Sequence, residues 1–320
     1  MPEANLLCSG LTRRMVPNRL RKLGSRLIIR RVSKGNLRDL QDKYAGVETN
    51  EMFTKTPKLA PVLYIPHGGG PLPLLGDPAH QQLVEFLKST PRSLGTPAAI
   101  VLISAHWEEE QPTITGGRHP DLLYDYHGFP PESYRIKYPA PGSPALAKRL
   151  YTLLEAGGLQ SRLDERRGFD HGLFVPLKIM YPHADIPCVQ LSLLASLDPI
   201  AHIAIGKALA PLRHENVLII GSGFSFHNLK AFFTSPPGTP DQQNEVFDHW
   251  LIDTCTNETL SSDEREERLA YWTSAPSARY CHPREEHLLP LHVCWGITQA
   301  MARLVFHGEV LGKKTCAFLW

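Results

Sequence analysis

The side chains best suited to chemistry in this chain are its histidines, of which there are 15 among 320 residues. Imidazole is the commonest metal ligand in proteins and carries protons near neutral pH. Three histidines directly follow short apolar runs: His67 ends PVLYIPH, His106 ends AAIVLISAH and His227 ends NVLIIGSGFSFH. Because ligands bind beyond the carboxyl ends of strands in open α/β sheets, we expect these three imidazoles to converge on one rim of a sheet.

Two further strings add candidate histidines. His171 follows an aspartate in GFDHGLF, and HPREEHLLPLH places His282, His287 and His292 five residues apart. This spacing differs from the H-E-x-x-H motif of metalloproteases, so the spacing alone is weak support for a metal. Neutral imidazoles nevertheless suit Fe(II) or Zn(II), and three ligands on one face of such an ion leave positions for a substrate and a second small molecule.

The other histidines occur in less informative patterns. His127, in YDYHGFP, could line a pocket. The remaining seven are predicted to lie on the surface or on helix faces: His80, His119, His183, His202, His214, His249 and His307.

Motifs of other enzyme classes are incomplete. The string HGGG at residues 67–70 matches the oxyanion-hole loop of some lipases and esterases. That chemistry requires a G-x-S-x-G nucleophile elbow, and the nearest string, GFSFH at residues 223–227, ends in histidine instead of glycine. GSGFSF at residues 221–226 lacks the third glycine of a dinucleotide-binding loop, and the sequence has no Walker motif. The acidic run at residues 108–110 is more typical of a solvated loop than of a metal site.

The predicted elements alternate between strands and helices. Four compact apolar runs predict strands buried on both faces: residues 61–65, 98–104, 186–194 and 216–221. Helices are predicted from Ser143, an N-cap before Pro144, to the glycines at 157–158, and over about 198–213, 244–257 and 290–307. This alternation predicts a single three-layer α/β/α domain with a central sheet that is mostly parallel or mixed. Residues 108–142 and 260–286 read as long irregular segments, which usually carry a site.

Charge is unevenly distributed along the chain. Of its 34 basic and 32 acidic side chains, ten basic and one acidic lie in residues 1–38, which leaves 24 basic and 31 acidic side chains for the rest. The body of the chain is therefore mildly acidic. Such a body is a poor fit for nucleic acid, because phosphates require clustered Lys and Arg.

The first residues read as a separate extension. Residues 11–32 alternate basic with apolar side chains and lack acids, which is typical of a mitochondrial transit peptide; a disordered basic extension is the alternative. We expect an extension over residues 1–58 and a catalytic domain over 59–320, in the cytoplasm, or in mitochondria if the extension is a transit peptide. Scattered cysteines predict a reducing compartment with Cys188 and Cys294 buried. No apolar run approaches the roughly 20 residues of a membrane span.

Taken together, these strings resemble the class III extradiol ring-cleavage dioxygenases of the LigB superfamily, and within it the DOPA 4,5-dioxygenase branch. The resemblance covers residues 60–320 and is carried, in order, by PHGGGPLPLLGD, ISAHWEE, YDYHGFP, FDHGLFVPLKIMYPHADIP, VLIIGSGFSFHN and HPREEHLLPLHV. It implies a LigB-like fold and an oxidoreductase that opens a catechol ring beside the diol, incorporating both atoms of O2.

The resemblance also implies roles for individual histidines. The metal, Fe(II) for activity with Zn(II) as the alternative, would be held by His67, His106 and His287. His227 matches a position that serves as the acid/base or, in zinc-bound members, as a further ligand. His171 matches another histidine of the pocket.

Two positions depart from relatives. Glu286 is adjacent to His287, and protocatechuate-cleaving relatives have a glutamate as third ligand, so a carboxylate ligand remains an alternative to His287. Asn228 follows His227 where pigment-forming plant members have proline, so the chain resembles the wider branch more than those enzymes.

The substrate is less well specified by the sequence. Five aromatic side chains near the loops could stack on a catechol: Trp107, Tyr124, Tyr126, Phe129 and Tyr134. Arg135, Lys137 or Arg284 could pair with a substrate carboxylate, as a DOPA-like ligand would need. The alternative function is a zinc-loaded binding or signalling protein similar to the Memo proteins, which share this fold. We expect a monomer or homodimer whose partners are a small-molecule catechol and O2, with no nucleic acid and no membrane.

Overall fold

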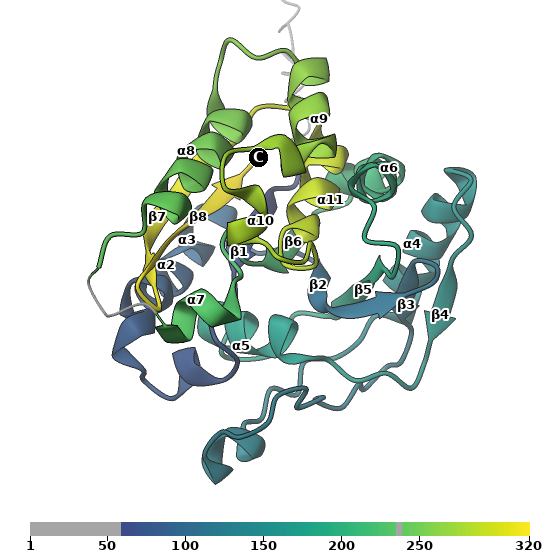
Figure 1. The fold of residues 1–320 in the computed structure, drawn as a ribbon. Helices are drawn as coiled ribbons and strands as arrows, with labels where there is room; N and C mark the ends of the chain where they lie inside the picture. Colours follow the sequence, from purple (N-terminus) through teal and green to yellow (C-terminus); the bar gives the residue numbers. More distant parts are fainter. Residues whose placement is uncertain (1–58, 235–238) are drawn as a thin grey trace, which may run out of the picture. The chain divides into compact units, whose positions relative to one another are not determined.

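In a computed structural model, the described residues, 59–234 and 239–320, form one eight-stranded mixed sheet (Figure 1). Its strands are β1 (Val62–Pro66), β2 (Ala99–Glu109), β3 (Thr113–Thr115), β4 (Arg162–Asp164), β5 (Cys188–Leu194), β6 (Val217–Gly223), β7 (Arg303–Val310) and β8 (Lys313–Leu319). Their spatial order is β4-β3-β5-β2-β6-β1-β8-β7, and the four central strands β5, β2, β6 and β1 run parallel.

The helices surround this sheet. The α-helices are α2 (Gln81–Ser89), α3 (Pro91–Leu94), α4 (Pro144–Ala156), α5 (His171–Met180), α6 (Pro199–Leu209), α7 (Leu229–Thr234), α8 (Gln242–Thr256), α9 (Ser262–Ala270), α10 (Ala278–Cys281) and α11 (Leu289–Thr298). Short 3-10 turns cover Leu72–Leu74, Pro78–His80, Pro131–Arg135, Ala210–His214 and Trp272–Ser274.

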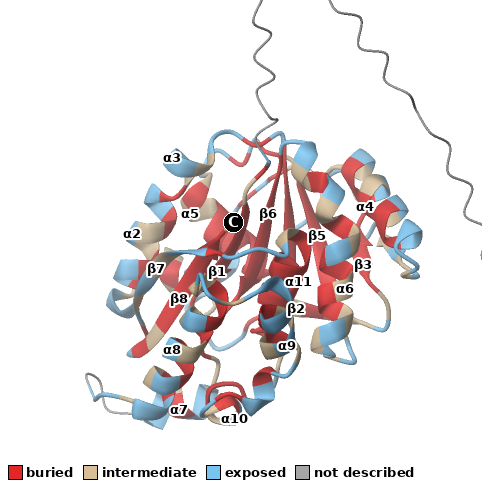
Figure 2. Cartoon of the chain, turned by 90° about the horizontal axis from the view of Figure 1, so that it is seen from above, coloured by how far each residue is buried: buried red, intermediate tan, exposed pale blue. Residues whose placement is uncertain are grey.

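Two apolar cores lie on opposite faces of the sheet. In β2, Val101 and Ile103 pack into the core that α4, α6, α8 and α11 cover, whereas Ile100 and Leu102 pack into the core that α2 and α5 cover. Figure 2 shows the resulting layers, with buried strands between helices whose outer faces are exposed. The predicted three-layer α/β/α domain is confirmed, because parallel strands buried on both faces require helices on both sides.

Most predicted elements form close to their expected bounds. All four apolar runs become the central strands β1, β2, β5 and β6. Ser143 caps α4 as predicted, since its hydroxyl accepts a hydrogen bond from the backbone N–H of Leu146, with Pro144 at the first helical position.

The prediction of one helix over residues 290–307 is wrong in its second half. Helix α11 ends at Thr298, and Gln299 adopts a left-handed conformation with φ of 47°. Residues Arg303–Val310 then form β7, which pairs antiparallel with β8 at the sheet edge. Val305, Phe306 and Val310 are residue types that strands favour, and Gly308 disfavours continuation of the helix. His307 is consequently on a strand, 2.8 Å from the Asp248 carboxylate.

Residues 260–286 are also more regular than predicted. They contain α9 and α10. Helix α9 begins with a capping box, in which the Ser261 side chain accepts from the Glu264 N–H and the Glu264 carboxylate accepts from the Ser261 N–H. The S-x-x-E string was a readable signal for this start. The segment 108–142 begins with the last two residues of β2 and otherwise holds only β3 and one 3-10 turn, so it is largely irregular as predicted.

Three further predictions concern the N-terminal extension, the burial of the cysteines and the absence of a membrane-spanning segment. The extension at residues 1–58 lies outside the described residues, and its role stays a prediction. The five described cysteines are buried free thiols, which confirms the prediction for Cys188 and Cys294. None of the described helices combines the length and apolar composition needed to cross a bilayer.

Two histidines predicted at the surface or on helix faces are fully buried. His202 lies on α6, where Nδ1 contacts the Asp198 carbonyl at 2.7 Å and Nε2 accepts from the Leu194 N–H at 3.0 Å. His80 is equally buried. Sequence patterns miss this because both imidazoles satisfy backbone groups inside the fold, and such pairing makes a buried polar side chain acceptable. The other five, including His214, are exposed.

The buried His202 predicts acid sensitivity. Burial lowers the pKa of His202 from 6.5 to about 4. Between these pH values the unfolded chain binds a proton that the folded chain does not, so stability falls as pH drops through this window, by up to about 1.4 kcal/mol per pH unit. In metal-free protein, His202→Gln should reduce the slope of unfolding free energy against pH, measured by urea denaturation. Exposed His214→Gln should leave the slope unchanged; equal slopes in all three proteins would contradict the assignment.

Candidate metal centre and active site

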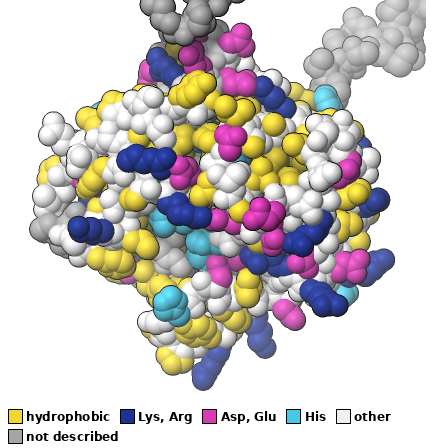
Figure 3. All heavy atoms as spheres, turned by 45° about the vertical axis from the view of Figure 1, so that its right-hand side comes forward, with side chains coloured by type: hydrophobic (Ala, Val, Ile, Leu, Met, Phe, Trp, Pro, Cys, Tyr) yellow, Lys and Arg dark blue, Asp and Glu magenta, His cyan; other side chains and the backbone are white. Residues whose placement is uncertain are grey.

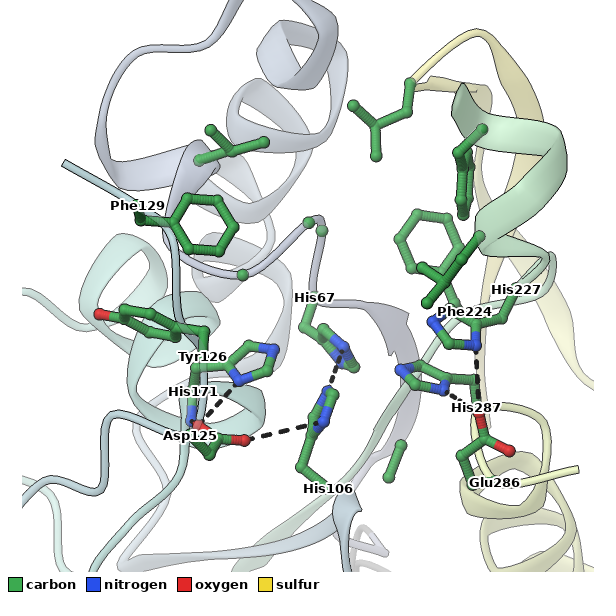
Figure 4. Close-up of a pocket in the computed structure, with 18 of the residues that line it drawn as sticks. His67, His106, Asp125, Tyr126, Phe129, His171, Phe224, His227, Glu286 and His287 are labelled. Atoms are coloured by element: carbon green, nitrogen blue, oxygen red, sulfur yellow. Dashed lines mark hydrogen bonds and ion pairs between the residues drawn. The ribbon is translucent and has the colours of Figure 1, made fainter. Parts of the chain in front are cut away.

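The predicted convergence of histidines is observed at the carboxyl ends of the central strands. His67 directly follows β1 and His106 lies near the end of β2, and their Nε2 atoms are 2.9 Å apart. Their rings meet edge-on at an interplanar angle of 62°, with His171 and His287 on either side (Figure 4). Ring centroids of His171 and His287 are each 5.3 Å from that of His67.

Ser222 on β6 fixes the orientation of His67. The Ser222 hydroxyl donates to the Gly172 carbonyl at 2.6 Å, so it is free to accept from His67 Nδ1, which lies 3.1 Å away. The proton of His67 is thereby held on Nδ1. Its Nε2 then carries a lone pair directed at His106, which is the form that ligates a metal.

Asp125 connects His106 to His171. One carboxylate oxygen accepts from both the backbone N–H and the Nδ1 of His171, at 2.9 Å each, and the other lies 3.7 Å from Nδ1 of His106. Asp170, next to His171 in the sequence, instead accepts hydrogen bonds from Ser104 and other neighbours. Burial would raise the pKa of Asp125, but its hydrogen bonds from His171 outweigh this and lower the pKa.

Glu286 holds the two remaining imidazoles. Its Oε1 lies 3.0 Å from Nδ1 of His287 and 3.1 Å from Nδ1 of His227. The two rings stack with centroids 3.4 Å apart. Burial opposes ionisation of Glu286, but the hydrogen bonds from His227 and His287 outweigh it, so its pKa lies well below the ordinary value. A carboxylate shared in this way directs both Nε2 atoms away from itself (Figure 4).

The backbone of His287 is anchored to the sheet. Its carbonyl accepts from the Phe224 N–H at 2.9 Å and from the Tyr64 hydroxyl at 3.1 Å. This close approach requires glycine at position 223, because a Cβ there would lie 2.1 Å from the His287 carbonyl oxygen. The segment between α10 and α11 is thus joined to the ends of β1 and β6.

The glycines that follow His67 pack against the buried side chain of His80. The Gly69 N–H donates to Nε2 of His80 at 2.9 Å, and Nδ1 of His80 lies 3.0 Å from the Asp77 carboxylate. Gly68 has a φ of 87°, and a Cβ there would be 2.5 Å from Pro73. The HGGG string therefore forms a tight turn around the buried side chain of His80.

Substitution in this turn should be destabilising. Gly68→Ala adds a clash to a left-handed backbone, whereas Gly76→Ala, with φ of 78° and open space around it, adds only the backbone strain. We expect Gly76→Ala to lower the free energy of unfolding by about 1–2 kcal/mol and Gly68→Ala by roughly 1–3 kcal/mol more. Urea denaturation measures the difference; equal losses would show that the turn accommodates a side chain.

The imidazoles at the centre are kept neutral. Burial, followed by repulsion from neighbouring imidazoles, lowers the pKa of His67 and of His106 well below 6.5. Burial, followed by the electrostatic interaction with His227, lowers the pKa of His287 to about 3. Neutral imidazoles retain the lone pair that a metal needs, so this cluster suits a cation and disfavours protonation.

Within the described residues, three groupings bring potential metal-ligating atoms within 4.8 Å of one another. One contains His67, His106 and His287 and includes no carboxylate. The others are His106 with Asp125 and His171, and His227 with Glu286 and His287. All of these side chains line a cavity of about 770 Å³. In Figure 3, histidine side chains are visible in a hollow with charged side chains along one rim.

The other predicted site residues divide between the cavity and the rest of the fold. Tyr126, Phe129, His127 and Arg284 line the cavity. The predicted side chains outside it are Trp107, Tyr124, Tyr134, Arg135, Lys137 and His282. His282 is fully buried, and its Nε2 contacts the Ser225 carbonyl at 3.0 Å.

Two residues of the site, Asp125 and Ser222, were not predicted individually from the sequence. Asp125 was readable in principle, because metal-ligating histidines commonly pair with a carboxylate and YDYHGFP contains one. Ser222 carries no such signal, since a serine in a buried strand is ordinary. The acidic run, expected as a solvated loop, instead begins within β2, where Glu108 lines the cavity and accepts a hydrogen bond from Arg284 at 2.5 Å.

Known proteins resemble this chain over most of its length. Residues 62–315 match the family described as the catalytic LigB subunit of aromatic ring-opening dioxygenase. Dioxygenase tasH of Hapsidospora irregularis is 42% identical over 82% of this chain and 86% of its own. 4,5-DOPA dioxygenase extradiol of Beta vulgaris is 42% identical over 73% and 85%, and that of Escherichia coli is 36% identical over 72% and 82%.

The fold has a solved counterpart. The crystal structure of an uncharacterized protein from Escherichia coli K12 superposes with a TM-score of 0.66 at 30% identity, covering 81% of this chain and 99% of that one. The matched family spans β1 to β8 and includes every histidine of the centre. The chain therefore belongs to the LigB family of aromatic ring-opening dioxygenases and is a 4,5-DOPA dioxygenase-like enzyme of the extradiol class.

Proposed function

We propose that this protein opens the ring of a catechol beside the diol, with O2 as co-substrate and Fe(II) held by His67, His106 and His287. The observation that carries the proposal is the cluster of two buried imidazoles, His67 and His287, with the partly buried His106, a carboxylate-free set of ligand atoms within 4.8 Å of one another. The family match and the extradiol dioxygenases among its relatives support this chemistry. They favour an enzyme over a zinc-loaded binding protein.

The donor set fits such a metal. The Nδ1 atoms of His67 and His287 are engaged by Ser222 and Glu286, which leaves their Nε2 lone pairs available. Imidazole suits both iron and zinc, and a three-histidine face leaves open positions. Bound Fe(II) would supply a Lewis acid that lowers the pKa of the catechol hydroxyls and a redox centre for O2.

His227 is the proposed acid/base. Its Nδ1 lies 3.1 Å from Glu286 Oε1, so Nδ1–H donates to the carboxylate and Nε2 is left to accept a proton from a catechol hydroxyl. The same carboxylate stabilises the imidazolium that results. The proton can then return from Nε2 to an oxygen of the product.

His171 is proposed to orient the ring. Asp125 holds its Nδ1 at 2.9 Å, which fixes the imidazole, and the Tyr126 ring lies edge-on with centroids 5.7 Å apart. Phe129 extends this aromatic wall, and its ring centroid lies 5.4 Å from that of Tyr126. A catechol placed between this wall and His227 has aromatic contacts on one side and the base on the other.

Glu286 should act as a positioning residue and not as a ligand. Glu286→Ala leaves Nδ1 of His287 and His227 without their shared acceptor, and loss of such an outer partner typically weakens metal affinity by about 10- to 100-fold. Glu286→Gln keeps an acceptor oxygen and should lose less. Metal affinity is measured by competition with a chromophoric chelator. If Glu286→Gln loses metal as fully as His287→Ala, the carboxylate is itself the third ligand.

Anaerobic reconstitution with Fe(II), followed by a panel of 4-substituted catechols, tests the function. O2 uptake and visible absorbance of a ring-opened product should appear together. Absence of product from every catechol would contradict the proposal. Metal analysis of protein purified from its own host complements this test, since zinc as the native metal would favour the binding-protein alternative.

A further inference from the structure

The outer part of the cavity is apolar. Figure 4 shows Phe129 and Phe224 on opposite sides of the opening next to His67. The cavity wall further includes Leu72, Leu229, Phe232, Phe233 and Leu311. Leu229 and Phe233, both on α7, are 58% and 85% exposed, which is unusual for side chains of this size and leaves apolar surface for a bound molecule to cover.

The charged side chains of the cavity already have partners. Among the residues that the structure describes, its lining contains the carboxylates Glu108, Asp125 and Glu286 and a single Lys or Arg side chain, Arg284. Glu108 binds Arg284 through two hydrogen bonds of 2.5 and 2.6 Å, and Glu286 lies 3.4 Å from the same guanidinium. Asp125 is used by His171 and His106.

This distribution discriminates between classes of catechol. An amino-acid substituent brings a carboxylate and an ammonium, and burying either without a partner is unfavourable. The three lining carboxylates repel another carboxylate, and the guanidinium that could attract it is occupied in a bidentate pair. A divalent ion at the imidazoles would bring the lining only to neutrality, which leaves no positive charge in excess for a substrate carboxylate.

We propose that the preferred substrate is a catechol whose ring substituent is apolar, such as an alkyl, prenyl or aryl group, and not an amino acid or carboxylic acid. The diol would reach the histidines while the substituent lies against Phe129, Leu229 and Phe233. This inference rests on the proposed ring-opening function and assigns the substrate class of the same cavity.

A homologous series tests the inference on the Fe(II)-loaded protein. For catechol and its 4-methyl, 4-ethyl, 4-propyl and 4-butyl derivatives, kcat/KM should rise by up to about fourfold for each methylene that becomes fully buried. L-DOPA and 3,4-dihydroxyphenylpropanoate should fall below 4-propylcatechol. A flat series, or L-DOPA as the best substrate, would overturn the proposal.

Variants at the wall localise the effect. Phe233→Ala and Leu229→Ala should lower kcat/KM for 4-butylcatechol by about five- to tenfold and change that for catechol little. Met301→Ala removes an exposed apolar side chain outside the cavity and should change neither. Leu229→Lys should raise the preference for 3,4-dihydroxyphenylpropanoate relative to 4-propylcatechol. Equal losses for catechol and 4-butylcatechol would place the substituent elsewhere.

Binding separates this inference from the proposed function. Dissociation constants of the same ligands, measured anaerobically on the metal-loaded protein, should give the same ranking without turnover. If no catechol is opened but the alkyl series still binds progressively tighter, the ring-opening proposal fails and the apolar subsite stands. If catechols are opened but binding does not follow chain length, the substrate class is wrong.

Discussion

His67→Ala is expected to abolish both metal binding and ring opening. His67 lies at the centre of the imidazole cluster, 2.9 Å from His106 Nε2 and with Ser222 fixing its proton on Nδ1. Its removal leaves two imidazoles of the carboxylate-free set, which is too few for a stable three-ligand face. Metal content after Fe(II) reconstitution should fall to background by elemental analysis, and O2 uptake with any catechol should be undetectable.

A matched control distinguishes the loss of a metal ligand from a general loss of folded structure. His214→Ala removes an exposed imidazole that does not line the cavity and should keep metal content and rate. Both variants should keep the far-ultraviolet circular dichroism of the parent. Full metal loading of His67→Ala would contradict its assignment as a ligand.

His227→Ala should separate proton transfer from metal binding. The Nε2 of His227 is the proposed base, and removing a general acid/base typically lowers the rate by about 10²- to 10⁴-fold. His67, His106 and His287 remain, so the variant should still bind one equivalent of Fe(II). Steady-state kcat and metal content are measured on the same preparation.

Substrate acidity gives a sharper test of this role. A catechol acidified by a 4-nitro group needs less help in losing its proton, so the defect of His227→Ala should shrink for 4-nitrocatechol relative to 4-methylcatechol. A structural role would lower both rates alike. If His227→Ala loses metal as fully as His67→Ala, His227 is a further ligand and the division of labour proposed here is wrong.

The central strands and the convergence of their histidines were predictable from the sequence. Buried parallel strands appear in the sequence as continuous apolar runs, and their carboxyl ends lie at one edge of the sheet. The sequence therefore predicted that His67 and His106 lie close together. The resemblance added His287, which no strand pattern could place, because its position depends on the carbonyl contact with Phe224 across the fold.

Partners that arrive from distant segments were not predictable. The tautomer of His67 depends on Ser222, 155 residues away, and the pairing of His171 depends on Asp125 instead of its neighbour Asp170. The antiparallel pairing of β7 with β8 was likewise not predicted, although Val305, Phe306 and Val310 are residue types that strands favour. Local patterns report burial and periodicity, whereas these features follow from tertiary contacts.

The most direct test of the central claim is a single-turnover reaction of Fe(II)-loaded protein with 4-methylcatechol and isotopically labelled O2, analysed by mass spectrometry. An extradiol dioxygenase predicts one ring-opened product in which both atoms of a single O2 molecule are incorporated, and no product from Zn(II)-loaded protein. A quinone without labelled oxygen, or equal product with Zn(II), would contradict the account.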